Sequence, residues 1–159
     1  MSTQVLTEQS SAVRAFVALV RAHAAAIRGL NGQLVEDHGL TINDYEVLLR
    51  LARAPDRRMR RVDLASEVLL TASGVTRLLD GLEKAGFVER GSCDTDRRVV
   101  YAVLTESGLA KLRQASESHV AQIEELFAAH FPETDVVALA GLLEQLDTAA
   151  DGDADCPPE

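Results

Sequence analysis

The sequence lacks long apolar runs and a secretory signal, and it has only two cysteines. No apolar run approaches the roughly 18 residues that a membrane-spanning helix requires. The N-terminal residues also lack the basic and apolar blocks of a signal peptide. We therefore expect a cytoplasmic protein with no membrane partner.

Residues with metal-binding or catalytic potential are sparse. Cys93 and Cys156 are too far apart for a zinc cluster or a disulfide framework, and free thiols suit a reducing compartment. No two histidines lie four residues apart, so we expect no metal site. We find neither a nucleophile–base pair nor a glycine-rich phosphate loop, and therefore expect no enzymatic activity and no cofactor.

An excess of positive charge is also missing, because the net charge is −9. This charge by itself disfavours a nucleic-acid partner. The distribution is uneven, however: residues 53–98 hold ten basic and eight acidic residues, and the remainder holds six basic and seventeen acidic. A DNA-binding face needs local positive charge to displace phosphate counterions. The pattern is compatible with such a face in residues 53–98, and also with a mixed solvated surface.

Apolar spacing predicts a mainly α fold with six helices. In the first, apolar residues recur three, four or seven positions apart. We expect Thr41, Thr71 and Thr105 to cap the second, fourth and fifth helices, with Asp44 favouring the positive end of the second. Gly86 is expected to end the fourth in the left-handed conformation. The expected helices lie within residues 9–36, 41–54, 62–68, 72–85, 106–130 and 134–149.

A β-hairpin is predicted between the fourth and fifth helices. Residues 87–90 are read as a short strand, residues 99–104 are rich in β-branched side chains and are read as a second strand, and a polar turn separates the two. At the C-terminus, residues 150–159 are acidic with glycine and proline and offer almost nothing to bury, which predicts a disordered tail.

Two short helices followed by a hairpin are typical of a winged helix-turn-helix, which we assign to residues 41–105. The second of the two helices fits a major groove about 12 Å wide and presents its first turn to base edges. Hydrogen-bond donors gather there, at Ser73, Thr76 and Arg77, and the small Gly74 lets the backbone approach DNA. The partner predicted from this pattern is double-stranded DNA.

The predicted hairpin loop ends in Asp96-Arg97-Arg98. Two adjacent arginines at a tip suit a narrow, electronegative minor groove. They are also compatible with solvated charges that protect an edge strand from aggregation.

Two stretches carry a family resemblance. DLASEVLLTASGVTRLLDGLEKAGFVER (63–90) and DRRVVYAVLTESG (96–108) closely resemble the MarR family of bacterial transcription regulators. The resemblance implies an obligate homodimer in which the helical regions 9–36 and 106–149 interlock. It also implies binding to a pseudo-palindromic operator, usually with repression of transcription. Many members of the family release DNA when a small phenolic or aromatic effector binds. The apolar stripe of 9–36 is itself too long to be covered within one subunit.

The resemblance and the helix-turn-helix pattern together assign the DNA contacts. The candidate DNA-binding residues are Arg61, Thr71, Ser73, Gly74, Thr76, Arg77, Asp96, Arg97 and Arg98. In the family pattern Arg98 matches the arginine that enters the minor groove, Arg97 its phosphate-contacting neighbour, and Asp96 the carboxylate that orients arginines. Cys93 and Thr95 stand where the family commonly has Asp and Arg, so one basic contact is missing at the tip.

Alternatives stay open at several positions. Ser73, Thr76 and Arg77 also fit ordinary exposed helix residues, and the net acidity keeps open a winged-helix module that binds protein instead of DNA. Cys93 sits in a basic loop that favours a reactive thiolate and a redox switch, or is a tolerated small residue.

The predicted effector site is less specific than the DNA contacts. We assign His23, Asp44 and Tyr45 to it, between the first, second and fifth helices, although Tyr45 fits a plain core position equally well. His119, on an apolar helix face, is interpreted as a satisfied interior or dimer-interface histidine.

Overall fold

A computed structural model describes residues 10–68, 72–92 and 99–151. The chain divides into two compact units, residues 1–120 and residues 121–159, and each is described by itself. Thr71, Cys93, Asp96, Arg97, Arg98 and most of the predicted tail lie outside the described residues. Residues 150 and 151, which we expected in the tail, belong instead to the last helix.

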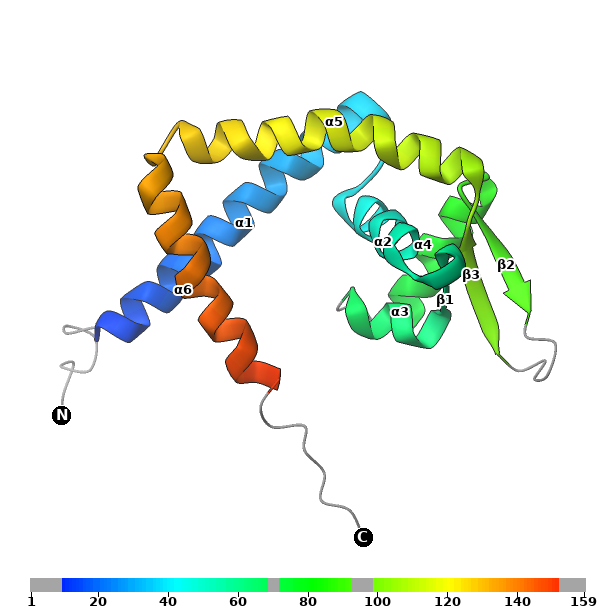
Figure 1. The fold of residues 1–159 in the computed structure, drawn as a ribbon, viewed down its shortest axis with the longest axis horizontal. Coiled ribbons are helices and arrows are strands. Elements are labelled where there is room, and N and C mark those ends of the chain that lie inside the picture. Colours follow the sequence, from blue (N-terminus) through cyan, green and yellow to red (C-terminus); the bar gives the residue numbers. More distant parts are fainter. Residues whose placement is uncertain (1–9, 69–71, 93–98, 152–159) are drawn as a thin grey trace, which may run out of the picture. The chain divides into compact units, whose positions relative to one another are not determined.

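The first unit holds the helices and strands of the expected winged helix-turn-helix (Figure 1). In chain order they are α1 (Ser11–His38), α2 (Ile42–Arg53), the 3-10 turn η2 (Pro55–Arg57), β1 (Arg58–Arg60), α3 (Arg61–Glu67), α4 (Ala72–Lys84), β2 (Val88–Ser92), β3 (Val100–Leu104) and the beginning of α5 (Glu106–Ala128). The second unit holds the end of α5 and α6 (Glu133–Asp151). The prediction of six helices and a hairpin is confirmed.

The sheet has a third strand that the sequence analysis missed. The order is β1-β3-β2, with both neighbouring pairs antiparallel and Met59 and Val88 paired with Ala102 and Leu104 of β3. β1 has only three residues, two of them arginines, which is too short to show the alternation typical of a strand. β2 also runs through Gly91 and Ser92, which we had assigned to the turn.

Side-chain caps set the predicted helix starts. The Asp44 backbone N–H donates to the Thr41 hydroxyl oxygen at 3.1 Å, and the Thr41 backbone N–H donates to the Asp44 carboxylate at 2.8 Å. This reciprocal capping box fixes the start of α2. At α5, the Gly108 N–H donates to the Thr105 hydroxyl oxygen at 3.0 Å, as predicted for a cap.

Gly86 ends α4 in the left-handed conformation, with a φ of 77°. The Gly86 N–H donates to the Glu83 carbonyl and the Phe87 N–H to the Leu82 carbonyl, each at 3.0 Å. This pair of bonds is the Schellman arrangement, which satisfies the last carbonyls of the helix and turns the chain directly into β2.

One apolar core joins the helix-turn-helix to the sheet. It contains fully or almost fully buried side chains from α2, α3, α4 and the strands: Val47, Leu48, Leu51, Leu64, Val75, Leu79, Leu82, Val88, Ala102 and Leu104. The burial of so many aliphatic side chains stabilises this part of the chain. The core thereby gives α4 a rigid base.

Among the described helices, none is by itself long and apolar enough to cross a membrane, and α5 and α6 meet that criterion only when combined.

Candidate DNA-binding interface

The first turns of α4 present polar side chains on the face away from the core. Val75 and Leu79 are almost fully buried, whereas Ser73, Thr76 and Arg77 are exposed. The helical period puts these two sets on opposite faces, so the residues that anchor α4 leave the polar ones facing outward. The structure therefore brings three of the predicted DNA-binding residues together.

The remaining predicted contacts near this turn differ in their settings. Gly74 is half-buried within the same turn. The Arg77 guanidinium pairs with no acidic side chain in the described part of the chain, which leaves it available to a phosphate or a base edge. Thr71 precedes the helix and lies outside the described residues.

The wing is built from β2 and β3, which pair over all five residues of each strand. Gly91 is needed for this pairing, because a Cβ there would lie 2.9 Å from the Val103 side chain. The predicted tip contacts and Cys93 fall between the two strands, outside the described residues. The structure thus shows the stem of the wing.

Arg61, one of the candidate DNA-binding residues, forms an ion pair within the protein. It is the first residue of α3, and its side chain donates to Glu83 of α4 at 2.6 Å. Only 19% of the Arg61 side chain and 20% of the Glu83 side chain are exposed. A DNA contact by Arg61 stays a prediction.

Glu83 also binds the wing, which the sequence analysis missed. It accepts from the Nε of Arg90 on β2 at 2.9 Å, and another nitrogen of Arg90 donates to Asp80 at 3.2 Å. The hydrogen bond to Glu83 is the largest cause of a raised pKa at Arg90. Asp80 and Glu83 lie three residues apart, which puts both carboxylates on one face of α4.

Two further arginines, both on β1, interact with neighbouring side chains. Arg60 makes a two-pronged hydrogen bond to the Asp63 carboxylate, at 2.6 and 2.9 Å, and this bond raises the pKa of Arg60. The Arg58 guanidinium lies 4.3 Å from the centre of the Tyr101 ring, a cation–π contact. The local positive charge expected in residues 53–98 is therefore partly neutralised by internal partners.

The three predicted effector residues have different surroundings in the structure. Asp44 is used in the capping box of α2, and His23 is exposed on α1. Tyr45 is a core residue, with its hydroxyl 3.1 Å from the Ser116 hydroxyl and its ring centre 4.7 Å from that of His119. In the described residues, no hydrogen bond, ion pair or ring contact joins His23 to the other two.

A partly buried polar cluster lies where α5 meets α1 and α2. The His38 Nε2 is 2.6 Å from the Ser118 hydroxyl, and His119 is only 4% exposed. The Nδ1 atom of His119 has no hydrogen-bond partner among the described residues, so this histidine is interior but not fully satisfied. Burial lowers its pKa. Among all the residues that the structure describes, no group of three or more acidic, histidine or cysteine side chains could hold a metal ion.

The comparisons with known proteins agree with this architecture. Residues 38–99 match the sequence model of the MarR family. The transcriptional repressor YetL of Bacillus subtilis is 32% identical over 116 residues, which are 71% of this chain and 70% of YetL.

Two solved structures from Streptomyces coelicolor extend the likeness. AbsC, a MarR family transcriptional regulator, is 31% identical with a TM-score of 0.73, covering 92% of this chain and 99% of AbsC. Sco3205, a MarR family regulator solved in complex with DNA, has a TM-score of 0.79 at 24% identity and covers 93% of this chain and 92% of Sco3205, which supports the fold. The identity and coverage of YetL and AbsC, together with the helix order and the wing, show that the chain belongs to the MarR family, whose members are transcription regulators and not enzymes.

Proposed function

We propose that the protein is a repressor that binds a pseudo-palindromic DNA duplex as a homodimer, with α4 of each copy in the major groove. The observation that carries this proposal is the exposed set Ser73, Thr76 and Arg77 on a helix whose opposite face is locked into the core. A rigidly held helix positions its side chains more precisely for base recognition. The DNA complex of the structurally similar Sco3205 supports the same use of the fold.

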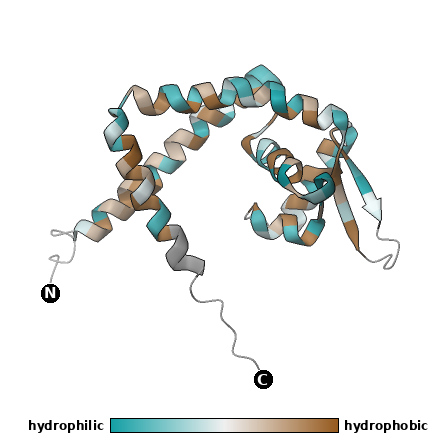
Figure 2. Cartoon of the chain, in the orientation of Figure 1, coloured by the Kyte–Doolittle hydropathy of each residue, from teal (hydrophilic) through white to brown (hydrophobic). Residues whose placement is uncertain are grey.

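A second copy of this chain is the partner that suits the unburied helices. On α1, Phe16 is 67% exposed and Val13 and Val20 are exposed beside it, and α6 exposes Val137, Leu142 and Leu146. Hydrophobic residues run along each of the two helices (Figure 2). Soluble monomers rarely expose apolar stripes of this kind, so we infer that the partner copy covers them.

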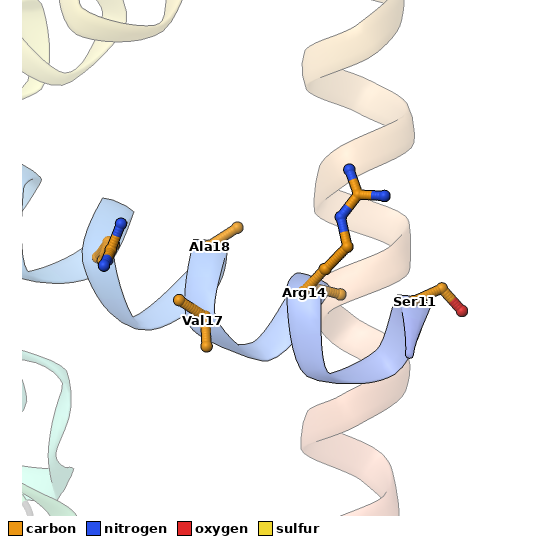
Figure 3. A pocket seen from close by; sticks show the side chains of 6 residues that line it. Ser11, Arg14, Val17 and Ala18 are labelled. Atoms are coloured by element: carbon orange, nitrogen blue, oxygen red, sulfur yellow. The ribbon is translucent and has the colours of Figure 1, made fainter. Parts of the chain in front are cut away.

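The surface of α1 also has room for a partner's side chains. Six residues of this one helix, including Arg14, Val17 and Ala18, line an open depression (Figure 3). A depression bordered by both apolar and basic groups suits packing against another helix of mixed character.

The wing completes the proposed DNA contacts. Arg97 and Arg98 bind the minor groove and the adjacent phosphates, and Asp96 orients them, while Thr71 and Gly74 bring the start of α4 close to the backbone. Cys93 in the same loop is a candidate for oxidation that weakens this contact.

The proposed effector is a small aromatic or phenolic molecule, with His23, Asp44 and Tyr45 as the candidate contacts. The Tyr45 hydroxyl bonds to α5 while its backbone belongs to α2, which leads into the helix-turn-helix. A phenolic ligand offers the same ring and hydroxyl as Tyr45 and competes for the same partners. Such competition shifts α2 relative to α5 and thereby the DNA-binding elements.

Footprinting on the DNA that flanks the gene for this protein tests the proposal. We expect the full chain to protect an inverted repeat, with its two halves about one helical turn apart, and the Arg77→Ala variant to lose that protection at the same concentration. Protection of no site by the full chain, or of random sites equally by both proteins, would refute the proposed function.

A further inference from the structure

The carboxylate of Glu83 joins three elements of the winged helix-turn-helix. It accepts from Arg61 at the start of α3 at 2.6 Å and from Arg90 on β2 at 2.9 Å, while its own backbone lies in the last turn of α4. Arg90 continues the contact to Asp80, one turn earlier on α4. The wing strand is therefore tied to α4 at two points.

The burial of this cluster is graded. The Arg61–Glu83 pair is about four-fifths buried, whereas Arg90 is 59% exposed. A partly buried ion pair is screened less by salt than an exposed one, and loss of the carboxylate leaves the arginine charge without its partner. Glu83 is thus the carboxylate that both arginines share.

We propose that Glu83 is a positioning residue for DNA binding: it holds α3, α4 and the wing strand in one fixed relation, so that the first turn of α4 and the wing reach the duplex together. The proposal rests on the proposed DNA-binding function. In the proposed complex, Glu83 itself does not contact DNA. It acts through Arg61 and Arg90.

The sign of the expected effect separates this role from simple electrostatics. A carboxylate near a DNA-binding face repels phosphate, so its neutralisation on charge grounds alone leaves affinity unchanged or raises it. Loss of a positioning residue lowers affinity, because binding then has to order the wing against α4. The two explanations predict opposite changes for the same substitution.

The test compares the affinity of the full-length wild type and variants for an operator duplex selected from a random library by the wild type. Glu83→Gln is expected to bind roughly tenfold more weakly, the scale of coupling between contacting residues. Glu89→Gln is the matched control, because Glu89 is exposed on β2 next to Arg90, and no ion pair joins Glu89 to the described residues. This control is expected to bind as tightly as the wild type or more tightly.

A second variant keeps the test decisive if Glu83→Gln does not fold. Asp80→Asn removes only the outer anchor of Arg90 and leaves the buried Arg61–Glu83 pair in place. We expect a roughly threefold weaker affinity, with the slope of affinity against salt unchanged because no phosphate contact is lost. Affinity at or above the wild-type value in a folded Glu83→Gln or in Asp80→Asn overturns the positioning role. Failure of the wild type to select any duplex overturns the proposed function instead.

Discussion

The Thr105 hydroxyl donates to the carbonyl oxygen of Gly86 at 2.7 Å and so connects the end of α4 to the start of α5. The Thr105 hydroxyl oxygen also accepts from the Gly108 N–H at 3.0 Å, and the Thr105 N–H donates to the Phe87 carbonyl at 3.1 Å. One threonine therefore closes the base of the wing hairpin and caps the helix that follows it.

Replacement of this threonine tests the connection. Thr105→Val keeps the shape of the side chain but removes both hydroxyl bonds, so the free energy of unfolding should fall by about 1–2 kcal/mol. Thr105→Ser keeps the hydroxyl and should lose less. Urea unfolding measures both, and an equal loss for the two variants would show that the hydroxyl is not responsible.

Gly108 is predicted to tolerate no side chain. A Cβ at this position would overlap the Phe87 carbonyl oxygen and lie 2.8 Å from Leu104 Cδ1. Gly108→Ala should therefore reduce stability by about 1–3 kcal/mol, as overpacking does. Gly81→Ala is the control, because nothing lies within 4 Å of a Cβ there and alanine favours a helix. Thermal unfolding measures both variants, and an equal decrease in their melting temperatures would contradict this prediction.

The buried His119 predicts a pH dependence of stability. Burial lowers its folded-state pKa below the usual 6.5, so above that pH the ring is neutral in both the folded and unfolded chains. As the pH falls below about 6.5, the unfolded chain takes up a proton that the folded chain does not, and the free energy of unfolding decreases. His119→Phe keeps a ring against Tyr45 and should weaken this decrease.

Urea unfolding at about pH 7.5, 6.5 and 5.5 compares the two proteins. The difference between them should grow toward low pH. Parallel curves would show that His119 does not titrate differently in the folded chain.

The two groups of DNA contacts should differ in kind. Arg77→Ala should cost about 1–3 kcal/mol of binding and relax the preference for one base pair, because Arg77 is assigned to a base edge. Arg98→Ala should weaken binding to all duplexes more evenly. The affinities of both variants for the operator and for its single-base variants measure these effects. An identical pattern of losses for the two substitutions would show that Arg77 and Arg98 do not differ in this way.

The local features of the fold were predictable because their signals lie within a few residues. Thr41 together with Asp44 predicts the start of a helix, and Gly86 after an amphipathic stretch predicts the end of one. The apolar period also identified the buried side of α4, and with it the exposed residues Ser73, Thr76 and Arg77. The helix that we propose to bind DNA could therefore be located from the sequence.

Contacts between distant segments could not be predicted in the same way. The three-residue β1 is visible only once it pairs with β3, more than forty residues later. The same holds for Glu83, whose partners come from α3 and β2, and for His119, whose burial depends on Tyr45 of α2. Each of these depends on tertiary packing, and no local pattern marks it.

A salt titration of the full chain on its selected operator is the sharpest test of whether this protein binds duplex DNA through α4 and the wing. The logarithm of the binding constant should fall linearly with the logarithm of salt concentration, with a slope of about −0.9 for each phosphate neutralised. A scrambled duplex should bind more weakly at every salt concentration. Absence of duplex binding at about 50 mM salt, or equal affinity for the operator and the scrambled duplex, would contradict the claim.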